Sequence, residues 1–180
     1  MKLDAGKDFL RCEYCLTLHF PDPNADGVRV LDVDSEFACP RCKIPVLVHG
    51  AISGERVHYC IRCRGMLIPM GTFVGLIEEL RSRHESSEYA GKQLEWADLD
   101  RHLNCPQCHA PMNTHPYAGP GAVIIDSCST CYWNWLDHGE LQRIVRAPDH
   151  KFAALIDEDE RRKIDAEAEQ QGRGAWPFGG

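Results

Sequence analysis

Apolar residues recur at helical spacing in two stretches of the chain. The first stripe consists of Phe73, Leu76, Ile77 and Leu80. The second and shorter stripe consists of Leu141, Ile144 and Val145. Both follow the i, i+3, i+4 spacing that places side chains on one face of a helix, so we expect each helix to pack through this face. Asp137 followed by Glu140 predicts a capping box at the start of the second helix.

Each of these helices is preceded by two short apolar segments with turn residues between them. The first two segments cover residues 45–49 and 55–59, around Gly50 to Gly54. The second two cover residues 112–117 and 122–127, around the sequence AGPG at 118–121. Short apolar runs bounded by glycine and proline are typical of strands joined by tight turns. The pattern therefore predicts two β-hairpins, each followed by a helix.

Two more helices are predicted outside these units. Trp96, Leu99 and Leu103 lie at helical spacing within residues 93–103, which predicts a helix that links the two hairpin units. A C-terminal helix is predicted by the apolar residues Phe152, Leu155, Ile156 and Ile164.

The ten cysteines change this picture because all of them stand in Cys-x-x-Cys pairs. The five pairs are Cys12/Cys15, Cys39/Cys42, Cys60/Cys63, Cys105/Cys108 and Cys128/Cys131. A two-residue gap lets one tight turn present two thiolates to a tetrahedral metal ion, as in structural zinc sites. Disulfide frameworks are typical of secreted chains, whereas this sequence starts with charged residues where a signal peptide would be apolar. The cysteines are therefore interpreted as zinc ligands.

The last four pairs belong to an internal repeat. The segment CPRCKIPV at 39–46 aligns with CPQCHAPM at 105–112, and the next pair of each copy aligns after a hairpin that differs by two residues in length. Beyond that pair, Leu67 and Ile68 align with Trp135 and Leu136. Two Cys-x-x-Cys pairs at the ends of one hairpin describe a zinc ribbon. Each copy is expected to bind one zinc ion through four cysteines, namely Cys39, Cys42, Cys60 and Cys63 in the first and Cys105, Cys108, Cys128 and Cys131 in the second.

The second copy reads CPQC, a hairpin, CSTC and then WLDHGEL at 135–141, and it resembles the TFIIB-type zinc-ribbon domain of small bacterial zinc-finger proteins. The first copy resembles a degraded version, with LIPMGTF at 67–73 in the place of WLDHGEL. The resemblance implies a zinc-binding fold with the cysteines of the second copy as ligands. It does not by itself imply a role in transcription initiation. One departure concerns the residue after the second cysteine of each pair. The family has glycine there, where φ is positive, whereas this chain has Lys43, Arg64, His109 and Tyr132.

The sequence thus predicts a small, metal-stabilised α+β protein built from two tandem zinc ribbons. We expect an N-terminal segment at 1–38, ribbon 1 at 39–82, a linking helix within 83–104, ribbon 2 at 105–147, and a C-terminal helix with a flexible tail at 148–180. Bound metal would replace much of the hydrophobic core that units of this size cannot supply.

The first cysteine pair has no obvious second half, and several hypotheses stay open. One is a third zinc site completed by histidines, with His19 and either His49 or His58 as ligands. Another groups Cys12 and Cys15 with Cys39 and Cys42, which would leave the pair at 60 and 63 without partners. In a third, a second copy of the chain supplies the missing ligands in a homodimer. In a fourth, the pair stays reduced and free of metal.

Charge and composition restrict the classes of partner. The formal net charge is −7, and each four-thiolate site with one divalent ion adds −2, so the chain as a whole does not attract nucleic-acid phosphates. No apolar run approaches the roughly 20 residues of a membrane span, and reduced cysteine pairs fit a reducing compartment. We therefore expect a cytoplasmic protein without membrane contact. No Ser/His/Asp ordering, phosphate-binding loop or zinc-protease motif is present, so we expect no enzymatic activity.

The favoured function is a rigid, zinc-stabilised module that binds a macromolecular partner. A protein partner is favoured over a nucleic acid. Arg62 and Arg64 flank Cys63, where they either offset thiolate charge or form a small patch for an anionic partner. Tyr132 and Trp133 either pack over the metal site or form a stacking surface. Two alternative functions stay open. One is a redox-responsive zinc switch, and the other is a nucleic-acid-binding, transcription-associated protein that uses the basic patch.

Overall fold

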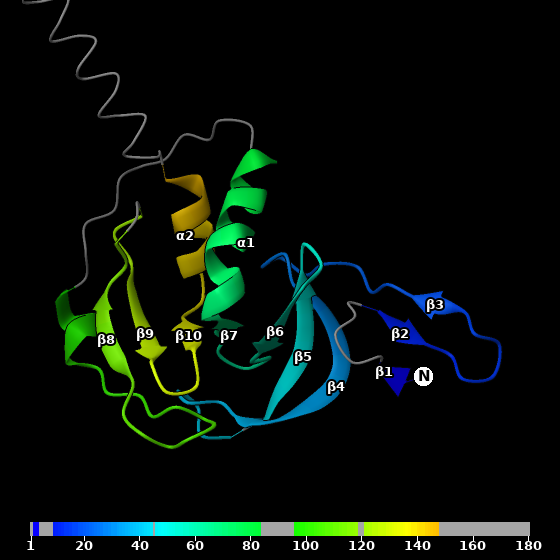
Figure 1. The fold of residues 1–180 in the computed structure, drawn as a ribbon, viewed down its shortest axis with the longest axis horizontal. Coiled ribbons are helices and arrows are strands. Elements are labelled where there is room, and N and C mark those ends of the chain that lie inside the picture. The colour runs from blue at the N-terminus through cyan, green and yellow to red at the C-terminus, as the bar shows by residue number, and fades with distance from the viewer. Residues whose placement is uncertain (1, 4–8, 45, 84–95, 119–120, 148–180) are drawn as a thin grey trace, which may run out of the picture. The chain divides into compact units, whose positions relative to one another are not determined.

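The computed structural model describes residues 2–3, 9–44, 46–83, 96–118 and 121–147 (Figure 1). The chain divides into two units, residues 1–147 and 148–180. The second unit, with the predicted C-terminal helix, lies outside the described residues. Within the first unit the strands form two antiparallel sheets, one of three strands and one of seven.

The three-stranded sheet has the order β1-β2-β3, with β1 at Lys2–Leu3, β2 at Leu10–Arg11 and β3 at Leu18–His19. The seven-stranded sheet has the order β4-β5-β6-β7-β10-β9-β8. Its strands are β4 (Arg29–Ala38), β5 (Val46–Ile52), β6 (Glu55–Tyr59), β7 (Met66–Pro69), β8 (Asn113–Pro116), β9 (Ile124–Cys128) and β10 (Trp133–Leu136). The helices are α1 (Met70–Ser82), α2 (Glu140–Arg146) and the 3₁₀ helix η1 (Trp96–Asp100). None of the described helices has the length and apolarity that a membrane span needs.

The strand order shows that the two ribbons are joined edge to edge. Strands β5, β6 and β7 of ribbon 1 correspond to β8, β9 and β10 of ribbon 2, and β7 pairs with β10 at the centre of the sheet. Leu67 lies opposite Trp135 in this pairing, and the internal repeat aligns these same two residues. The ribbons are therefore related by an approximate twofold axis near this pair. Strand β4 pairs with β5 and has no counterpart beside β8 among the described strands.

The hairpin strands lie close to their predicted positions. β6 covers the predicted residues 55–59, and β5 continues past its predicted end at residue 49 to Ile52. Ser53 and Gly54 form the turn between them with φ values of 49° and 85°, and two positive φ angles are the signature of a type I′ hairpin turn. In ribbon 2, β8 lies within its predicted range and β9 ends one residue later, at Cys128.

Side-chain alternation along the strands separates two hydrophobic cores. Val48, Ile68 and Leu136 pack in the core beneath the helices. The predicted helical stripes complete this core through Phe73, Leu76 and Ile77 of α1 and Leu141, Ile144 and Val145 of α2. Figure 1 shows α1 and α2 side by side. The neighbouring strand residues Leu47, Leu67 and Trp135 belong to the second core, which also contains the cysteines of both ribbons.

Residues 96–103 of the predicted linking helix are described, and among them only the short 3₁₀ helix η1 is helical. Leu103 lies beyond its end at Asp100, and the Leu103 carbonyl oxygen accepts a hydrogen bond from the backbone N–H of Met112 (2.8 Å). The Leu103 side chain is buried in the core that contains the cysteines. Residues 84–95 lie outside the described part of the chain.

The predicted capping box is only half formed. The Glu140 carboxylate accepts a hydrogen bond from the backbone N–H of Asp137 (2.6 Å), as predicted. However, the residue that precedes α2 is Gly139, with a φ of 83°, and no side chain caps the helix. The side chain of Asp137 does not cap the helix because it accepts hydrogen bonds from Arg101 and Trp135 instead.

Candidate metal centres

The cysteines of the two ribbons converge into two groups of four. Site 1 consists of Cys39, Cys42, Cys60 and Cys63, and site 2 consists of Cys105, Cys108, Cys128 and Cys131. Within each site all sulfur atoms lie within 4.8 Å of one another. The Sγ atoms of Cys39 and Cys63 are 3.7 Å apart, and those of Cys108 and Cys128 are 3.6 Å apart. Four sulfurs at about 2.3 Å from a tetrahedral zinc ion lie roughly 3.8 Å from one another, so both sites fit zinc.

One backbone turn, here called a knuckle, holds each cysteine pair. The carbonyl oxygen of the first cysteine accepts a hydrogen bond from the residue after the second, at 2.8 Å for Cys39, Cys60 and Cys128 and 2.9 Å for Cys105. This residue has positive φ in every ribbon knuckle, at 65° for Lys43, 60° for Arg64, 60° for His109 and 59° for Tyr132. The conformation that favours glycine is therefore kept although glycine is absent.

Backbone amides and burial set the properties of the thiols. The N–H groups of Cys42, Cys63 and Cys131 point at the sulfur of the first cysteine in their pair, at 3.3, 3.5 and 3.4 Å. Burial raises the pKa of Cys39 to about 12, whereas a hydrogen bond from the Ala110 N–H lowers the pKa of Cys108 to about 7. A zinc ion would bind the deprotonated form of all four thiols and release their protons. Four thiolates would then complete its tetrahedral coordination.

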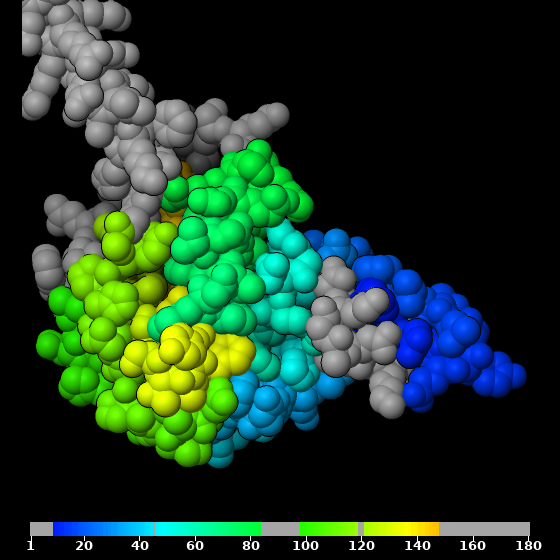
Figure 2. All heavy atoms as spheres, viewed as in Figure 1, coloured from blue at the N-terminus to red at the C-terminus, as the bar shows by residue number. Residues whose placement is uncertain are grey.

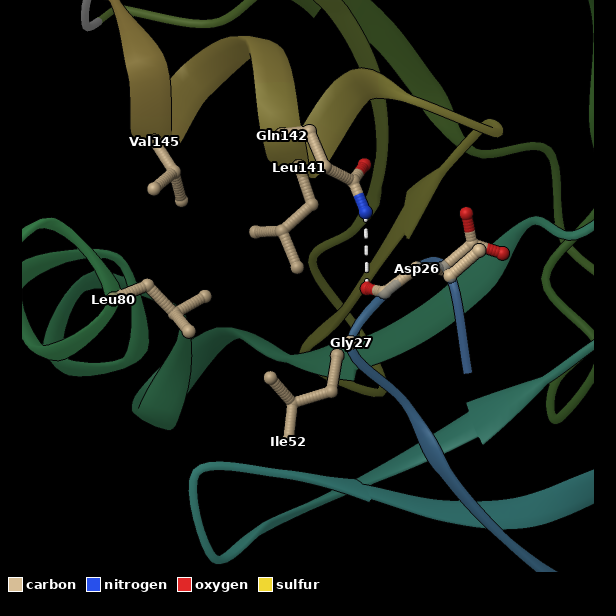
Figure 3. Close-up of a pocket in the computed structure, with 8 residues that line it drawn as sticks. Asp26, Gly27, Ile52, Leu80, Leu141, Gln142 and Val145 are labelled. Carbon is tan, nitrogen blue, oxygen red and sulfur yellow. Dashed lines mark hydrogen bonds between the residues drawn. The ribbon is translucent and has the colours of Figure 1, made fainter. Parts of the chain in front are cut away.

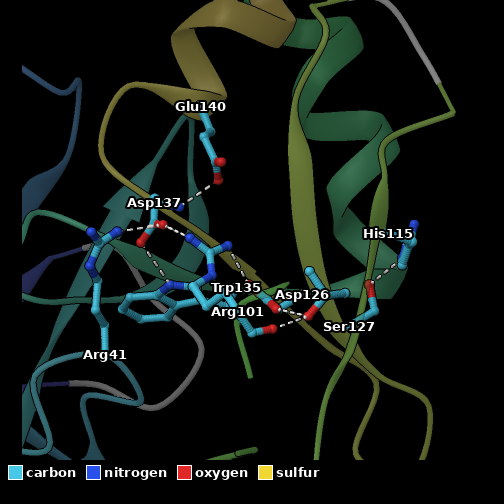
Figure 4. Close-up of polar contacts among 9 residues, drawn as sticks. Arg41, Arg101, His115, Asp126, Ser127, Trp135, Asp137 and Glu140 are labelled. Carbon is cyan, nitrogen blue, oxygen red and sulfur yellow. Dashed lines mark hydrogen bonds and ion pairs between the residues drawn. The ribbon is translucent and has the colours of Figure 1, made fainter. Parts of the chain in front are cut away.

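Arg101 and Asp137 organise a buried polar network beside the metal sites (Figure 4). Arg101 Nη2 donates to Asp126 Oδ2 (2.6 Å), whose side chain is fully buried, and Arg101 Nη1 donates to Asp137. Trp135 Nε1 donates to Asp137 Oδ1 (3.1 Å), and Arg41 Nη1 lies 2.5 Å from Asp137 Oδ2. The sequence reasoning missed this role of Asp137 and Arg101. Asp137 could have been singled out because it lies in the WLDHGEL segment of the repeat. Nothing in the sequence distinguishes Arg101 from other charged residues.

Glu140 adjoins this network and is almost fully buried. Burial raises its pKa to about 8, and the nearby carboxylate of Asp137 adds to the effect. At neutral pH the Glu140 side chain is therefore mainly protonated in the folded protein.

Of the two arginines that flank Cys63, Arg64 is held by an internal carboxylate. Its Nε and Nη2 donate to the two oxygens of Asp26 at 2.8 and 2.6 Å, and the Tyr59 hydroxyl donates to Oδ2 of the same residue (2.7 Å). Burial raises the pKa of Asp26, but the hydrogen bonds from Arg64 and Tyr59 outweigh this effect and leave it below its usual value. Arg62 makes a longer contact, from Nη1 to the carbonyl oxygen of Ile44 (3.4 Å).

The predicted aromatic pair of ribbon 2 divides between core and surface. Trp133 packs edge to face against Phe37 and His58, with ring centroids 5.8 and 5.2 Å apart, and its Nε1 donates to Gln107 Oε1 (2.7 Å). Tyr132 is exposed. Figure 2 shows the yellow segment that contains the last cysteine pair at the surface beside α1, where the backbone N–H of Met70 donates to the carbonyl oxygen of Tyr132 (2.9 Å).

A cavity of about 180 Å³ lies between the two helices and the segment before β4 (Figure 3). Ile52, Leu80, Leu141 and Val145 give it an apolar lining. At its polar end Gln142 Nε2 donates to the carbonyl oxygen of Asp26 (2.9 Å), while the Asp26 carboxylate points away from Gln142. This lining contains no cysteine or histidine, so the cavity offers no thiolate or imidazole ligand to a metal.

The first cysteine pair lies apart from both sites. Cys12 and Cys15 follow β2 and precede β3, and no group of three or more metal ligands among the described residues contains them. His19 is exposed in β3 opposite Leu10. The two other histidines considered, His49 and His58, face each other across β5 and β6. The hypothesis that grouped Cys12 and Cys15 with the pair at 39 and 42 is wrong, because that pair joins the one at 60 and 63.

Comparison with known proteins places the second ribbon in a family. Residues 104–147 match the family model of the TFIIB-type zinc ribbon, described as a transcription factor zinc-finger. The match confirms the resemblance for this segment, which is less than half of the chain, and the four-cysteine group at 39–63 is consistent with a degenerate first copy. No curated protein and no solved structure matches the chain. The prediction of two zinc sites in a small α+β protein is confirmed.

Proposed function

We propose that this chain is a zinc-stabilised binding module that presents the surface around site 1 to a protein partner. Four thiolates at each site leave a tetrahedral ion without an open position for a substrate. The role of the metal is then to hold the knuckles and the residues between them in a fixed geometry.

The rim of site 1, defined as Ile44, Val46, Ile61 and Arg62, exposes large apolar side chains beside the metal ligands. Ile44 is 76% exposed and Ile61 is 61% exposed. Ile61 directly follows the ligand Cys60, and the contact from Arg62 to the Ile44 carbonyl connects the two knuckles of the site. Exposed apolar clusters with a polar edge are typical of protein interaction sites.

Ribbon 2 provides an internal comparison for this rim, and this comparison is the observation that carries the proposal. The repeat places Ala110 at the position of Ile44 and Ser129 at the position of Ile61. Both ribbons form the same knuckles with the same positive φ angles. The fold therefore does not require isoleucine at either position, and a binding role accounts for two exposed isoleucines where small residues suffice.

The charges of ribbon 1 favour a protein over a nucleic acid. Arg64 is engaged by Asp26, and Arg41 is engaged by Asp137, so neither guanidinium is free for a phosphate. The chain also carries a formal net charge of −7. Lys43 and Arg62 are too small a basic patch to overcome this charge at physiological salt.

The test replaces the two isoleucines by their ribbon 2 counterparts. Tagged wild type, the double variant Ile44→Ala/Ile61→Ser and the control Val74→Ser are used to capture partners from the cells of origin after nuclease treatment. Val74 is an exposed apolar residue on α1, so the control removes exposed apolar area away from the rim. Native mass spectrometry first verifies that every variant binds as many zinc ions as the wild type.

We expect a protein that wild type and Val74→Ser retain and the double variant loses by at least roughly tenfold, which is the loss of about 1.4 kcal/mol. Equal recovery of that protein by all three chains contradicts a role for the rim. Loss of every retained protein after nuclease treatment, or submicromolar binding of nucleic acid by the wild type at 0.15 M salt, contradicts a protein partner.

A further inference from the structure

The first cysteine pair has the backbone of a zinc knuckle although it stands outside both ribbons. The carbonyl oxygen of Cys12 accepts a hydrogen bond from the residue four positions later (2.9 Å), and its N–H donates to the carbonyl oxygen five positions later (2.9 Å). Cys60 and Cys105 make the same two hydrogen bonds, at 2.8 to 2.9 Å. Leu16, which follows the second cysteine, has a φ of 59°, as in the ribbon knuckles.

This conformation is unfavourable for the residue that adopts it. A left-handed backbone costs a branched residue such as Leu16 about 1 to 2 kcal/mol relative to its ordinary conformation. Such strain persists where the surrounding structure or a ligand requires it. In the four ribbon knuckles the same strain accompanies a pair of metal ligands, so the turn at residues 12–17 is shaped for a metal as well.

Only half of a four-thiolate site is present in this knuckle. Each ribbon site combines two knuckles around one ion position, whereas Cys12 and Cys15 have no second knuckle among the described residues. The pair lies between the hydrogen-bonded strands β2 and β3, with Cys15 at the surface. A zinc ion on two thiolates alone would lack two of its four ligands.

The surface around the knuckle is apolar. Tyr14, between the two cysteines, is 98% exposed, and Leu16 is 65% exposed. Leu18 and Phe20 are also exposed. Four large apolar side chains within seven residues form a surface that water solvates poorly, which is typical of a contact between proteins.

We propose that a second copy of this chain completes the site, so that two Cys12/Cys15 knuckles bind one zinc ion through four thiolates. Both ribbon sites already use this combination of two like knuckles, and a twofold axis through the ion would generate it from two copies. The same axis would bring the exposed side chains of Tyr14 and Leu16 from both copies together. Arg11 and Glu13 give the hairpin from Leu10 to Leu18 balanced charge, so the two contacting hairpins add no local repulsion.

The experiment compares the full-length wild type with Cys12→Ser/Cys15→Ser under reducing conditions with zinc supplied. Light scattering measures the oligomeric state, and native mass spectrometry counts the metal ions. We expect the wild type to be a dimer that holds one zinc ion more than its four ribbon sites bind. The variant is expected to be a monomer that keeps two zinc ions, which shows that its ribbons are folded.

A mixing experiment separates the metal from the apolar contact. Wild type mixed with a differently sized, tagged Cys12→Ser/Cys15→Ser chain should form no mixed dimer, because a mixed pair offers only two thiolates. As the control, a differently sized, tagged wild-type chain keeps both cysteines and should form mixed dimers with the untagged wild type. Three outcomes would overturn the proposal. They are a monomeric wild type with two zinc ions, a monomer with three, and a dimer that survives in the double serine variant.

Discussion

The guanidinium of Arg41 lies 2.5 Å from the carboxylate of Asp137, and this ion pair connects the two ribbons. Arg41 stands between two ligands of site 1, whereas Asp137 belongs to the WLDHGEL segment of ribbon 2. The same carboxylate accepts hydrogen bonds from Arg101 and from the Trp135 indole. Asp137 therefore links site 1, the core of ribbon 2 and the segment between the ribbons.

Asp137→Ala should destabilise the protein strongly. The substitution leaves the largely buried guanidinium of Arg101 with one carboxylate fewer and the buried indole N–H of Trp135 without an acceptor. Removing one partner of a buried ion pair costs about 3 to 5 kcal/mol. Arg41→Ala is the matched control, because the Arg41 side chain is half exposed and its loss should cost about 1 kcal/mol or less. Urea unfolding of the zinc-loaded proteins measures both, and equal losses would contradict the central role of Asp137.

Gly65→Ala should also destabilise the protein, because Gly65 makes room for the largest buried side chain. A Cβ at this position would lie 2.3 Å from Cζ2 of Trp135. Overpacking of this kind costs about 1 to 3 kcal/mol. Gly75→Ala is the control, since a Cβ there meets nothing within 4 Å and alanine favours the α1 helix by about 0.5 to 1 kcal/mol. Thermal unfolding should thus shift in opposite directions for the two variants, and a gain in stability from Gly65→Ala would refute the close packing.

Glycine should be favourable in the knuckles where the replaced side chain has no other role. His109 is exposed with a φ of 60°, so His109→Gly should raise the free energy of unfolding by up to about 1 kcal/mol. Arg64→Gly relieves the same strain but removes the partner of the buried carboxylate of Asp26, so it should lower stability. Urea unfolding in excess zinc distinguishes the two. A stabilising Arg64→Gly would show that the ion pair contributes little.

The sequence was sufficient for features that depend on neighbouring residues. The cysteine spacing indicated the knuckles, the turn residues placed β6, and the apolar stripe identified the face of α1 that packs in the core. Positive φ at Lys43 and its equivalents followed from the family's glycine. Each of these features is encoded within a few consecutive residues, which is why a single sequence reveals it.

Features that depend on distant residues were not predictable in the same way. The repeat aligned Leu67 with Trp135, but nothing in the alignment showed that the two strands pair with each other. The buried link from Arg101 to Asp126 and Asp137 joins charged residues that look like ordinary surface positions in the sequence. Likewise Trp96, Leu99 and Leu103 fit one helix in the sequence, but the 3₁₀ helix ends at Asp100 and Leu103 bonds to Met112 of ribbon 2 instead. Long-range pairing leaves no periodic signal in one chain.

Stability should depend on pH through Glu140. Burial raises the folded pKa of this carboxyl to about 8, from the ordinary value of 4.5 that applies when the chain is unfolded. The contribution of Glu140 to the free energy of unfolding is therefore fully present below pH 4.5. It is lost progressively as pH rises from 4.5 through 8. Glu140→Gln stays neutral and keeps an acceptor for the Asp137 N–H. The variant should gain stability over the wild type by up to about 1.4 kcal/mol for each pH unit between 6 and 8.

The measurement for Glu140 is urea unfolding of wild type and variant at several pH values in excess zinc. Taking the difference between the two chains removes the titration of the metal sites, which is common to both. Glu79→Gln provides the control, since it removes the charge of an exposed carboxylate on α1. A difference for Glu140→Gln that does not change with pH would mean that Glu140 is ionised in the folded protein.

The joined sheet predicts that the two metal sites stabilise one cooperative unit. Cys128→Ser removes a ligand of site 2, and structural zinc is worth about 10 to 16 kcal/mol, which exceeds the reserve of a small domain. Independent ribbons, as the repeat alone would suggest, would leave ribbon 1 intact. Here, however, β10 pairs with β7, and Trp135 packs against Gly65, so the loss of ribbon 2 exposes an edge and a core of ribbon 1. Amide hydrogen exchange should show lost protection in β5 and β6 as well as in β9, and Cys60→Ser should have the reciprocal effect on ribbon 2. Native protection of β6 in Cys128→Ser would instead establish that the ribbons fold separately.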